Sequence, residues 1–260
     1  MDFLKAWLAA LGATIAFQTI MYLIGLLRKR RYDIVDVGWG PSFVVAALSV
    51  WLLNDTPTNA HYIIIAMVAL WAGRLARHIL GRWLRSREED PRYIELRSHW
   101  PKQYVDLQVF VRIFVAQALL ACLVSLPALV VLHSHKTPSV LMLVIGTLLW
   151  VCGFVFEAIG DAQLKAFIAK PENRGKLMTE GLWSMTRHPN YFGEITMWWA
   201  LALIAITLPY GWLGLGGATL ITILIAKVSG IPPAEKRAAE KPGWEDYKQK
   251  TAALIPFIRL

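Results

Sequence analysis

The stretch TRHPNYFGE, residues 186–194, places side chains capable of chemistry next to one another in a chain that is 56% hydrophobic. Arg187 can make paired hydrogen bonds to a phosphate group, and Tyr191 offers an aromatic ring and a hydroxyl donor. Asn190 can pair with an amide, and Glu194 would share its helix face four residues later. A solvated loop could hold the same mixture without any function, so the interpretation depends on where the membrane lies.

A membrane-spanning helix is expected to begin within this stretch. Pro189 suits the first turn of a helix because its ring fixes φ and its backbone lacks a donor. An aromatic belt at the membrane interface would account for Trp183, but not for Asn190 and Glu194 facing inward together. Glu194 is therefore a candidate proton donor, and His188 belongs to the candidate cofactor site.

A second polar stripe lies in VCGFVFEAIGDAQLKAF, residues 151–167. Glu157, Asp161 and Lys165 follow one another at intervals of four, which places them on one helix face. They could hydrogen-bond a ribose or an amide and, through the lysine, contact a phosphate. A salt-bridged helix end leaving the membrane would show the same pattern.

The basic segment AKPENRGKLMTEG, residues 169–181, follows directly. Its proline and glycine residues favour turns, so the loop could fold back over a ligand. A solvated basic loop on the cytoplasmic side is the alternative interpretation. The cations in this segment are Lys170, Arg174 and Lys176.

A third group lies in VDVGWGPSF, residues 35–43, at the start of another apolar run. An apolar site favours the protonated form of a carboxyl group, so Asp36 could donate a proton. Alternatively, this carboxylate could interact favourably with the helix dipole, near the arginines that precede it. The candidate catalytic residues are thus Asp36, Glu194 and Tyr191, and the candidate substrate contacts are Trp39, Gly40 and Trp71.

The arginines that directly follow the third apolar run can be interpreted in two ways. Arg74 and Arg77 could neutralise a pyrophosphate, or they could reach lipid headgroups by snorkelling. The segment EEDPRY, residues 88–93, comes next. Its Asp-Pro pair favours turn initiation, so we expect a folded loop that caps a cofactor.

Seven apolar runs must position these groups. Each approaches the roughly 20 residues that cross a hydrocarbon core of about 30 Å, once the flanks of the shorter runs are included. The alternative is that all seven runs are buried core helices. The continuous apolar character of the runs argues against this alternative. The expected fold is an all-α, polytopic membrane helix bundle with seven transmembrane helices. The runs are 3–27, 34–53, 62–72, 109–132, 139–156, 195–208 and 212–226.

The net charge is +9, and the lysines and arginines are distributed along the chain in a regular way. Of the 27 lysines and arginines, 24 fall in four segments that alternate with almost uncharged connections. By the positive-inside rule these segments face the cytoplasm, which places the N-terminus outside and the C-terminus inside. The expected partner is therefore the lipid bilayer rather than nucleic acid. The segments are 28–33, 74–105, 161–190 and 227–260.

Other features exclude several classes of protein. The first run is too long for a removable signal peptide and lacks its basic start and cleavage site. Cys122 and Cys152 both lie inside expected spans, so neither a disulfide framework nor a metal site is expected. No G-x-G-x-x-G stretch follows a strand-like segment, which excludes a soluble dinucleotide fold. Residues 1–260 are expected to form one integral-membrane domain.

The stretch RHPNYFGE followed by WW resembles the signature of the membrane steroid 5α-reductase-like family (3-oxo-5α-steroid 4-dehydrogenase C-terminal type), in its bacterial DUF1295 branch. VDVGWGPSF, EEDPRY, GLWSMTRHPNYFGE and a C-terminal W-x-D-Y stand in the order expected of that branch, so the resemblance covers nearly the whole chain. It implies a seven-helix bundle in the bacterial inner membrane that binds NADPH from the cytoplasmic side. The implied reaction reduces a carbon–carbon double bond conjugated to a ketone, as in a Δ4-3-ketosteroid or a similar lipid.

The sequence departs from this family at one important position. In the animal steroid reductases a Gln-Glu pair just before the matching Pro-Ser-Phe orients the ketone, whereas Gly38 and Trp39 stand here. The resemblance implies a hydrophobic, steroid-like substrate, and this departure leaves its identity open. Protein partners are not indicated by the sequence.

Two alternative functions stay open. The shorter form R-H-P-x-Y-x-G also resembles the cofactor loop of integral-membrane isoprenylcysteine carboxyl methyltransferases, which bind S-adenosylmethionine. The C-terminal segment lacks the paired Glu-Glu typical of those enzymes, although its Glu235 and Lys236 are candidate cofactor contacts. A transporter or membrane scaffold is the second alternative. A transporter would need polar residues through the midplane, and here they gather on one side.

Overall fold

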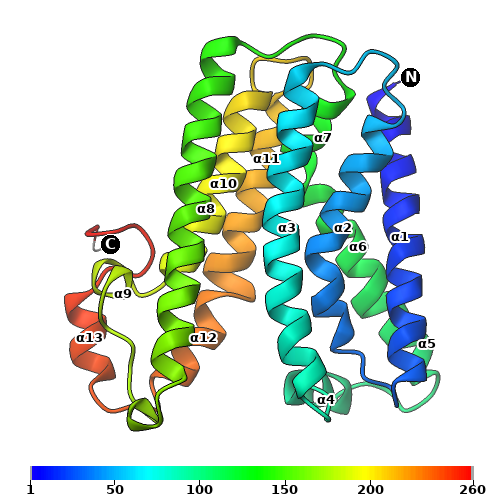
Figure 1. Ribbon diagram of the computed structural model, residues 1–260. Coiled ribbons are helices and arrows are strands. Elements are labelled where there is room, and N and C mark those ends of the chain that lie inside the picture. Colours follow the sequence, from blue (N-terminus) through cyan, green and yellow to red (C-terminus); the bar gives the residue numbers. More distant parts are fainter. Residues whose placement is uncertain (1, 259–260) are drawn as a thin grey trace. The chain divides into compact units, whose positions relative to one another are not determined.

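The computed structural model describes residues 2–258, and this part of the chain is helical, with no strand (Figure 1). The predicted all-α fold is confirmed. The chain forms two compact units. The first comprises the residues up to Pro138 together with Ala205–Gly216, and the second comprises Ser139–Ile204 and the residues from Gly217 on. The expectation of a single integral-membrane domain stays a prediction.

The first unit packs its long helices side by side, from blue to green in Figure 1. α2 packs between α1 and α3, and α6 lies against both α1 and α2. The fourth apolar run contains a π-helical turn and then breaks at Ser125, because Pro127 cannot continue the preceding helix. The helices are α1 Phe3–Leu27, α2 Ile34–Trp51, α3 Asn59–Arg85, α4 Pro91–Ser98, α5 Val105–Val109, η1 Phe110–Val115, α6 Ala116–Val124 and α7 Leu126–His133.

The second unit is built around one long helix, α8 (Val140–Ile168). The exposed face of α8 carries Val144, Leu148, Val151 and Val155, at the spacing of a lipid-facing stripe. The opposite face carries glycines and packs against α10. The other elements are η2 Pro171–Asn173, α9 Leu182–Met185, α10 Pro189–Ala205, α11 Trp212–Ile223, η3 Leu224–Val228, α12 Ile231–Ala238 and α13 Trp244–Lys250. The last residue of α10 and the start of α11 belong to the first unit.

Six helical stretches among the described residues are long and apolar enough to cross a membrane. α10 is not among them, because it has 17 residues. The expectation of a helical membrane protein is therefore confirmed. The count of seven spans and their orientation stay predictions. The six are Phe3–Leu27, Ile34–Trp51, Asn59–Arg85, Val105–Val124, Val140–Ile168 and Trp212–Ala238.

Candidate functional site

The stretch 186–194 is held by the last described residues of the chain. Thr186 pairs with Ala252 in an isolated parallel bridge, and the backbone N–H of Arg187 donates to the carbonyl of Ala252 at 2.8 Å. The side chain of Thr186 donates to the carbonyl of Leu254 at 2.8 Å. α10 begins at Pro189, as predicted. The tail thus fixes the backbone from which the candidate site residues project.

The guanidinium of Arg187 is buried and forms a network of hydrogen bonds with other residues of the second unit. Its Nε and Nη2 reach the same oxygen of Glu235, at 2.8 and 2.7 Å. Its Nη1 donates to the carbonyls of Lys248 and Thr251, at 3.0 and 2.6 Å. Arg187 therefore ties α12 and α13 to the start of α10. A phosphate contact by Arg187 stays a prediction, and it would require the guanidinium to exchange one of these acceptors.

His188 and Tyr191 continue this network along α10. Nε2 of His188 lies 3.3 Å from the same Glu235 oxygen that binds Arg187. The rings of His188 and Tyr191 stack with their centroids 5.4 Å apart. Tyr191 is half-buried. Glu235, from a segment about 45 residues downstream of the stretch, is therefore brought into the site by the fold.

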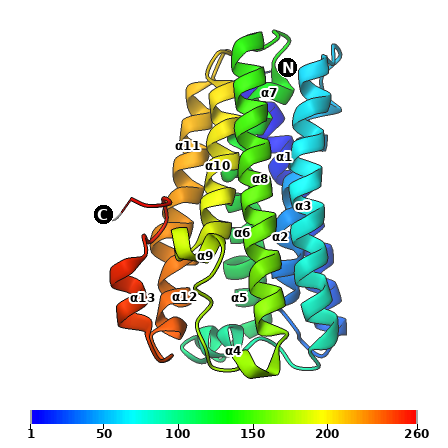
Figure 2. The same ribbon diagram turned by 60° about the vertical axis from the view of Figure 1, so that its left-hand side comes forward.

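α13 supports the loop that precedes α10. The hydroxyl of Tyr247 donates to the carbonyl of Trp183 at 2.6 Å, and burial raises the pKa of Tyr247 above its ordinary value. The indole of Trp183 donates in turn to the carbonyl of Gly160 on α8, at 3.0 Å. In both ribbon views α9 and α13 lie side by side (Figures 1 and 2). The loop is therefore anchored from two sides.

α8 and α10 approach each other closely where they carry their acidic residues. A Cβ on Gly193 would lie 2.4 Å from the carbonyl oxygen of Gly153 and 2.6 Å from the backbone nitrogen of Glu157, so only glycine fits there. Glu157 is 3% exposed. One turn further along α8 Asp161 is half-buried, and after another turn Lys165 is exposed. The predicted stripe thus runs from the helix interface out to solvent.

Asn190 and Glu194 lie on the first turns of α10 and are partly buried. The backbone of Asn190 packs near Gly160 of α8, since a Cβ on that glycine would lie 3.3 Å from the nitrogen of Asn190. The side-chain oxygen of Asn190 is buried and has no hydrogen-bond partner in the described structure. A buried acceptor is ordinarily satisfied, so this atom suits a donor from a bound ligand.

The loop between α8 and α9 folds back along the end of α8 (Figure 2) and is bordered by pockets. One, of about 540 Å³, is lined by four cations and by no carboxylate among the described residues. We call it the four-cation pocket. The Nζ of Lys241 donates to the carbonyl of Lys176 at 3.2 Å, which draws the turn between α12 and α13 against this loop. The four cations are Lys170, Arg174, Lys176 and Lys241.

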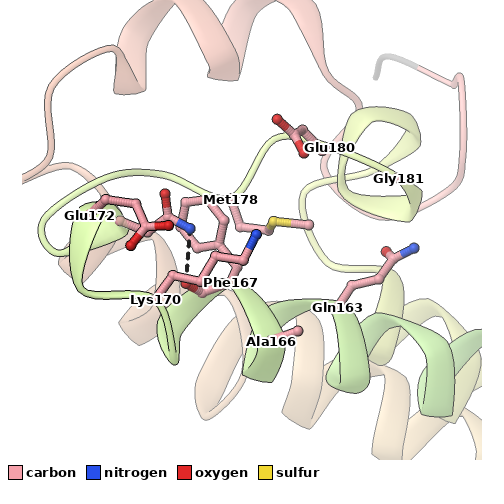
Figure 3. A pocket seen from close by; sticks show the side chains of 9 residues that line it. Gln163, Ala166, Phe167, Lys170, Glu172, Met178, Glu180 and Gly181 are labelled. Carbon is pink, nitrogen blue, oxygen red and sulfur yellow. Dashed lines mark hydrogen bonds between the residues drawn. The ribbon is translucent and has the colours of Figure 1, made fainter.

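A second pocket, of about 380 Å³, adjoins it and is shown in Figure 3. We call it the Phe167 pocket. Lys170, Phe167 and Met178 lie next to one another in it, with Gln163 and Glu180 nearer Gly181. Glu172 lies at the opposite end.

The first unit contains Asp36 in a cluster of its own. Asp36 accepts from the hydroxyl of Tyr93 at 2.5 Å and from Arg92 at 3.1 Å. The Asp-Pro pair, expected to start a turn in a loop, instead begins helix α4, which Asp90 caps by accepting from the backbone of Arg92, and the hydrogen bond from the Arg92 side chain lowers the pKa of Asp90. Arg31 pairs with Asp33 instead of Asp36. The EEDPRY segment therefore folds onto the start of α2.

The candidate substrate and arginine residues of the first unit fall on α2 and α3. Phe43 packs edge-on against both Trp39 and Trp71, with ring centroids 4.9 and 5.0 Å apart. Gly40 packs against the backbone of Ala72. Trp71 is buried, Arg74 is half-buried and Arg77 is exposed. The two tryptophans thus flank one aromatic ring.

The structure groups part of the predicted site and extends it. Arg187, His188 and Glu235 meet directly, whereas Lys236 is exposed on α12 and lines neither named pocket. Sequence reasoning missed Lys241, which comes from a segment 65 residues beyond Lys176. The Pro-Gly pair after Lys241 predicts that the chain turns there. It does not predict which loop the turn contacts.

The fold and the composition define a helical integral membrane protein. The chain belongs to the family described as "Protein of unknown function (DUF1295)", whose family model matches residues 21–251. The predicted DUF1295 membership is confirmed. The finer resemblance to steroid 5α-reductases stays a prediction.

A curated relative matches a shorter part of the chain. Over 67 residues the sequence is 39% identical to "Probable O-methyltransferase ustE" from Ustilaginoidea virens. The match covers 25% of this chain and 23% of that relative, so the chain spans less than a quarter of the relative's length. No solved structure matches the chain.

Proposed function

We propose that this protein is a membrane-embedded reductase that takes NADPH at the four-cation pocket and reduces the carbon–carbon double bond of a Δ4-3-ketosteroid or a similar lipid enone. The observation that carries the proposal is the lining of that pocket by Lys170, Arg174, Lys176 and Lys241. NADPH carries a pyrophosphate and a 2′-phosphate, which lysine and arginine bind well. The volume of about 540 Å³ lies within the roughly 300–1,000 Å³ of small-ligand sites.

The ends of α8 and α10 suit the nicotinamide half of the cofactor. The buried oxygen of Asn190 can accept from the carboxamide. Gly160, which contacts Asn190, lies seven residues before Phe167 of the pocket wall, or about 10 Å along α8. An extended dinucleotide can cover that span. Asp161 and Glu157, on the same helix, are then candidates to bind the ribose.

The reaction needs a donor at the ketone oxygen, where negative charge develops. Bound NADPH would supply the hydride for the β-carbon of the enone. Glu194 and Tyr191 are the candidate donors from α10, and Asp36 is the candidate from the first unit. Trp39, Gly40 and Trp71 are the proposed contacts of a hydrophobic, steroid-like substrate, while Arg74 and Arg77 are further candidates for the pyrophosphate.

The proposal includes seven spans, with α10 as the shortest. A helix of 17 residues is about 26 Å long, which approaches a hydrocarbon core of about 30 Å. With seven spans the cation-rich segments all face one side, which the positive-inside rule identifies as the cytoplasm. The cofactor site would then open to the cytoplasm from a bacterial inner membrane.

A methyltransferase that uses S-adenosylmethionine is the second candidate, and the name of the curated relative favours it. S-adenosylmethionine contains adenosine but no phosphate. Its single carboxylate would leave most of the four cations without an anionic partner in that function. This difference in charge separates the two candidates physically.

An activity assay on detergent-purified protein tests the proposal. We expect NADPH oxidation that depends on a Δ4-3-ketosteroid such as progesterone, with a product two mass units heavier than the substrate. Glu194→Gln should lower turnover by roughly 10²-fold, as for loss of a positioned acid. The exposed Glu240→Gln is the matched control. Transfer of a methyl group from S-adenosylmethionine, with no NADPH oxidation, would instead support the methyltransferase.

A further inference from the structure

The Phe167 pocket combines an aromatic wall with a polar edge. The ring of Phe167 and the thioether of Met178 are half-buried. Gln163, on α8, and Glu180, on the loop, line the end of the pocket away from Glu172, and their side chains stand apart (Figure 3). An aromatic wall with polar groups at one edge suits a flat heterocycle, which stacks on the ring and hydrogen-bonds at its edge.

Local structure fixes the donor on this polar edge. The side-chain oxygen of Gln163 accepts from the backbone N–H of Leu182 at 3.0 Å, which leaves its amide nitrogen as the donor. Gly181 has a φ of +60°, and a Cβ there would lie 2.5 Å from that nitrogen. Glycine therefore allows the amide to sit against the loop. The exposed carboxylate of Glu180, which also lines the pocket, is an acceptor.

The aromatic wall is fixed by the turn that follows α8. The side-chain nitrogen of Asn173 donates to the carbonyl of Phe167 at 3.0 Å, drawn as a dashed line in Figure 3. This bond closes the chain over the last turn of α8. The loop residue Met178 is thereby returned to the side of Phe167.

We propose that the Phe167 pocket binds the adenine ring of the cofactor. Adenine presents an acceptor, N1, next to a donor, the 6-amino group. The amide of Gln163 can donate to N1, and the exposed carboxylate of Glu180 can turn to accept from the amino group. Its face stacks on Phe167, and the thioether of Met178 contacts the ring from the loop. This inference rests on the proposed function, because it requires a cofactor that contains adenosine.

The position of the pocket agrees with the covalent structure of NADPH. The 2′-phosphate and the pyrophosphate both attach to the ribose that carries adenine, so the subsite for the base must border the subsite for phosphate. The Phe167 pocket and the four-cation pocket meet this condition because they share a wall. The common residues are Phe167, Lys170, Asn173 and Met178.

A change of base tests the inference in the full-length, detergent-purified protein. Deamino-NADPH carries hypoxanthine, whose N1–H and carbonyl reverse the donor and acceptor of adenine. We expect NADPH to bind about tenfold or more tightly than deamino-NADPH, since the wrong base sets a carbonyl against a carboxylate. Glu180→Gln offers an amide donor and should bring the two affinities close together. Glu245→Gln, on an exposed face of α13, should keep the wild-type preference.

The aromatic wall is tested in the same titrations. Phe167→Ala should weaken NADPH about tenfold, and Phe167→Tyr should restore the affinity because it keeps the ring. NADPH binding without preference between bases, and unchanged in Glu180→Gln and Phe167→Ala, would overturn the adenine subsite and leave the reductase proposal intact. Binding of S-adenosylmethionine alone, weakened in Phe167→Ala, would overturn the reductase proposal and support the subsite. Binding of neither cofactor would overturn both.

Discussion

Replacement of Arg187 by alanine is expected to lower the free energy of unfolding, because its guanidinium joins three segments of the second unit. The side chain is 9% exposed and donates to Glu235 and to the carbonyls of Lys248 and Thr251. Truncation leaves a largely buried carboxylate and two carbonyls without these donors. Loss of one partner of a buried ion pair costs about 3–5 kcal/mol.

Thermal unfolding in detergent, followed by tryptophan fluorescence, measures this cost. For a chain of this size roughly 2–4 °C corresponds to each kcal/mol, so the lower figure predicts a fall in Tm of about 6–12 °C. Trp244, whose ring lies 5.7 Å from the Arg187 guanidinium, reports from within the network. Arg237→Ala removes an exposed cation from the same unit and should change the free energy by less than about 0.5 kcal/mol.

A double-mutant cycle with Glu235→Ala separates the ion pair from the rest of the network. If the pair is the cause, the double variant should be less destabilised than the sum of the two single variants. Equal melting of Arg187→Ala and Arg237→Ala would refute the reasoning. It would mean that the tail and α12 hold their places without the guanidinium.

Three further predictions follow from other contacts. Gly193→Ala should lower the Tm strongly, because its Cβ would lie 2.4 Å from a backbone oxygen of α8, whereas Gly216→Ala, with open space around it, should not. The lowered pKa of Asp90 contributes stability that is present above its unfolded pKa of about 3.8 and is lost as the pH falls through the folded value. Asp90→Asn should therefore be less stable than wild type at pH 7, and the difference in Tm should shrink below about pH 3.8. A reporter fused to the C-terminus should read as cytoplasmic, and one inserted near Thr56 as external; the reverse result would contradict the orientation.

The helices could be predicted from the sequence because the apolar runs that form them are local features. Two details could not. The break at Ser125 follows from Pro127, whose effect on a long apolar run depends on how the preceding helix packs. The length of α10 depends on where the connection to α11 begins. The helix has 17 residues and is shorter than the span expected from the apolar run with its flanks.

The candidate site was predictable only where its residues are close in sequence. The stretch 186–194 and the stripe on α8 carry their chemistry in local spacing. The partner of Arg187 comes from α12, and Lys241 reaches its pocket through a turn far along the chain. Neither contact produces a periodic pattern in the sequence, because both contacts are created by tertiary packing. The same holds for the amide of Gln163, whose place against the loop depends on the positive φ of Gly181.

Titration of the purified protein with NADPH, NADH and S-adenosylmethionine at increasing salt tests the central claim most directly. The four-cation pocket predicts that NADPH binds more tightly than NADH, because only NADPH carries the 2′-phosphate. Added salt should weaken the NADPH affinity through screening, and Arg174→Ala should weaken it about tenfold, while the exposed Lys248→Ala leaves it unchanged. Binding of S-adenosylmethionine with none of NADPH, unaffected by Arg174→Ala, would contradict the account.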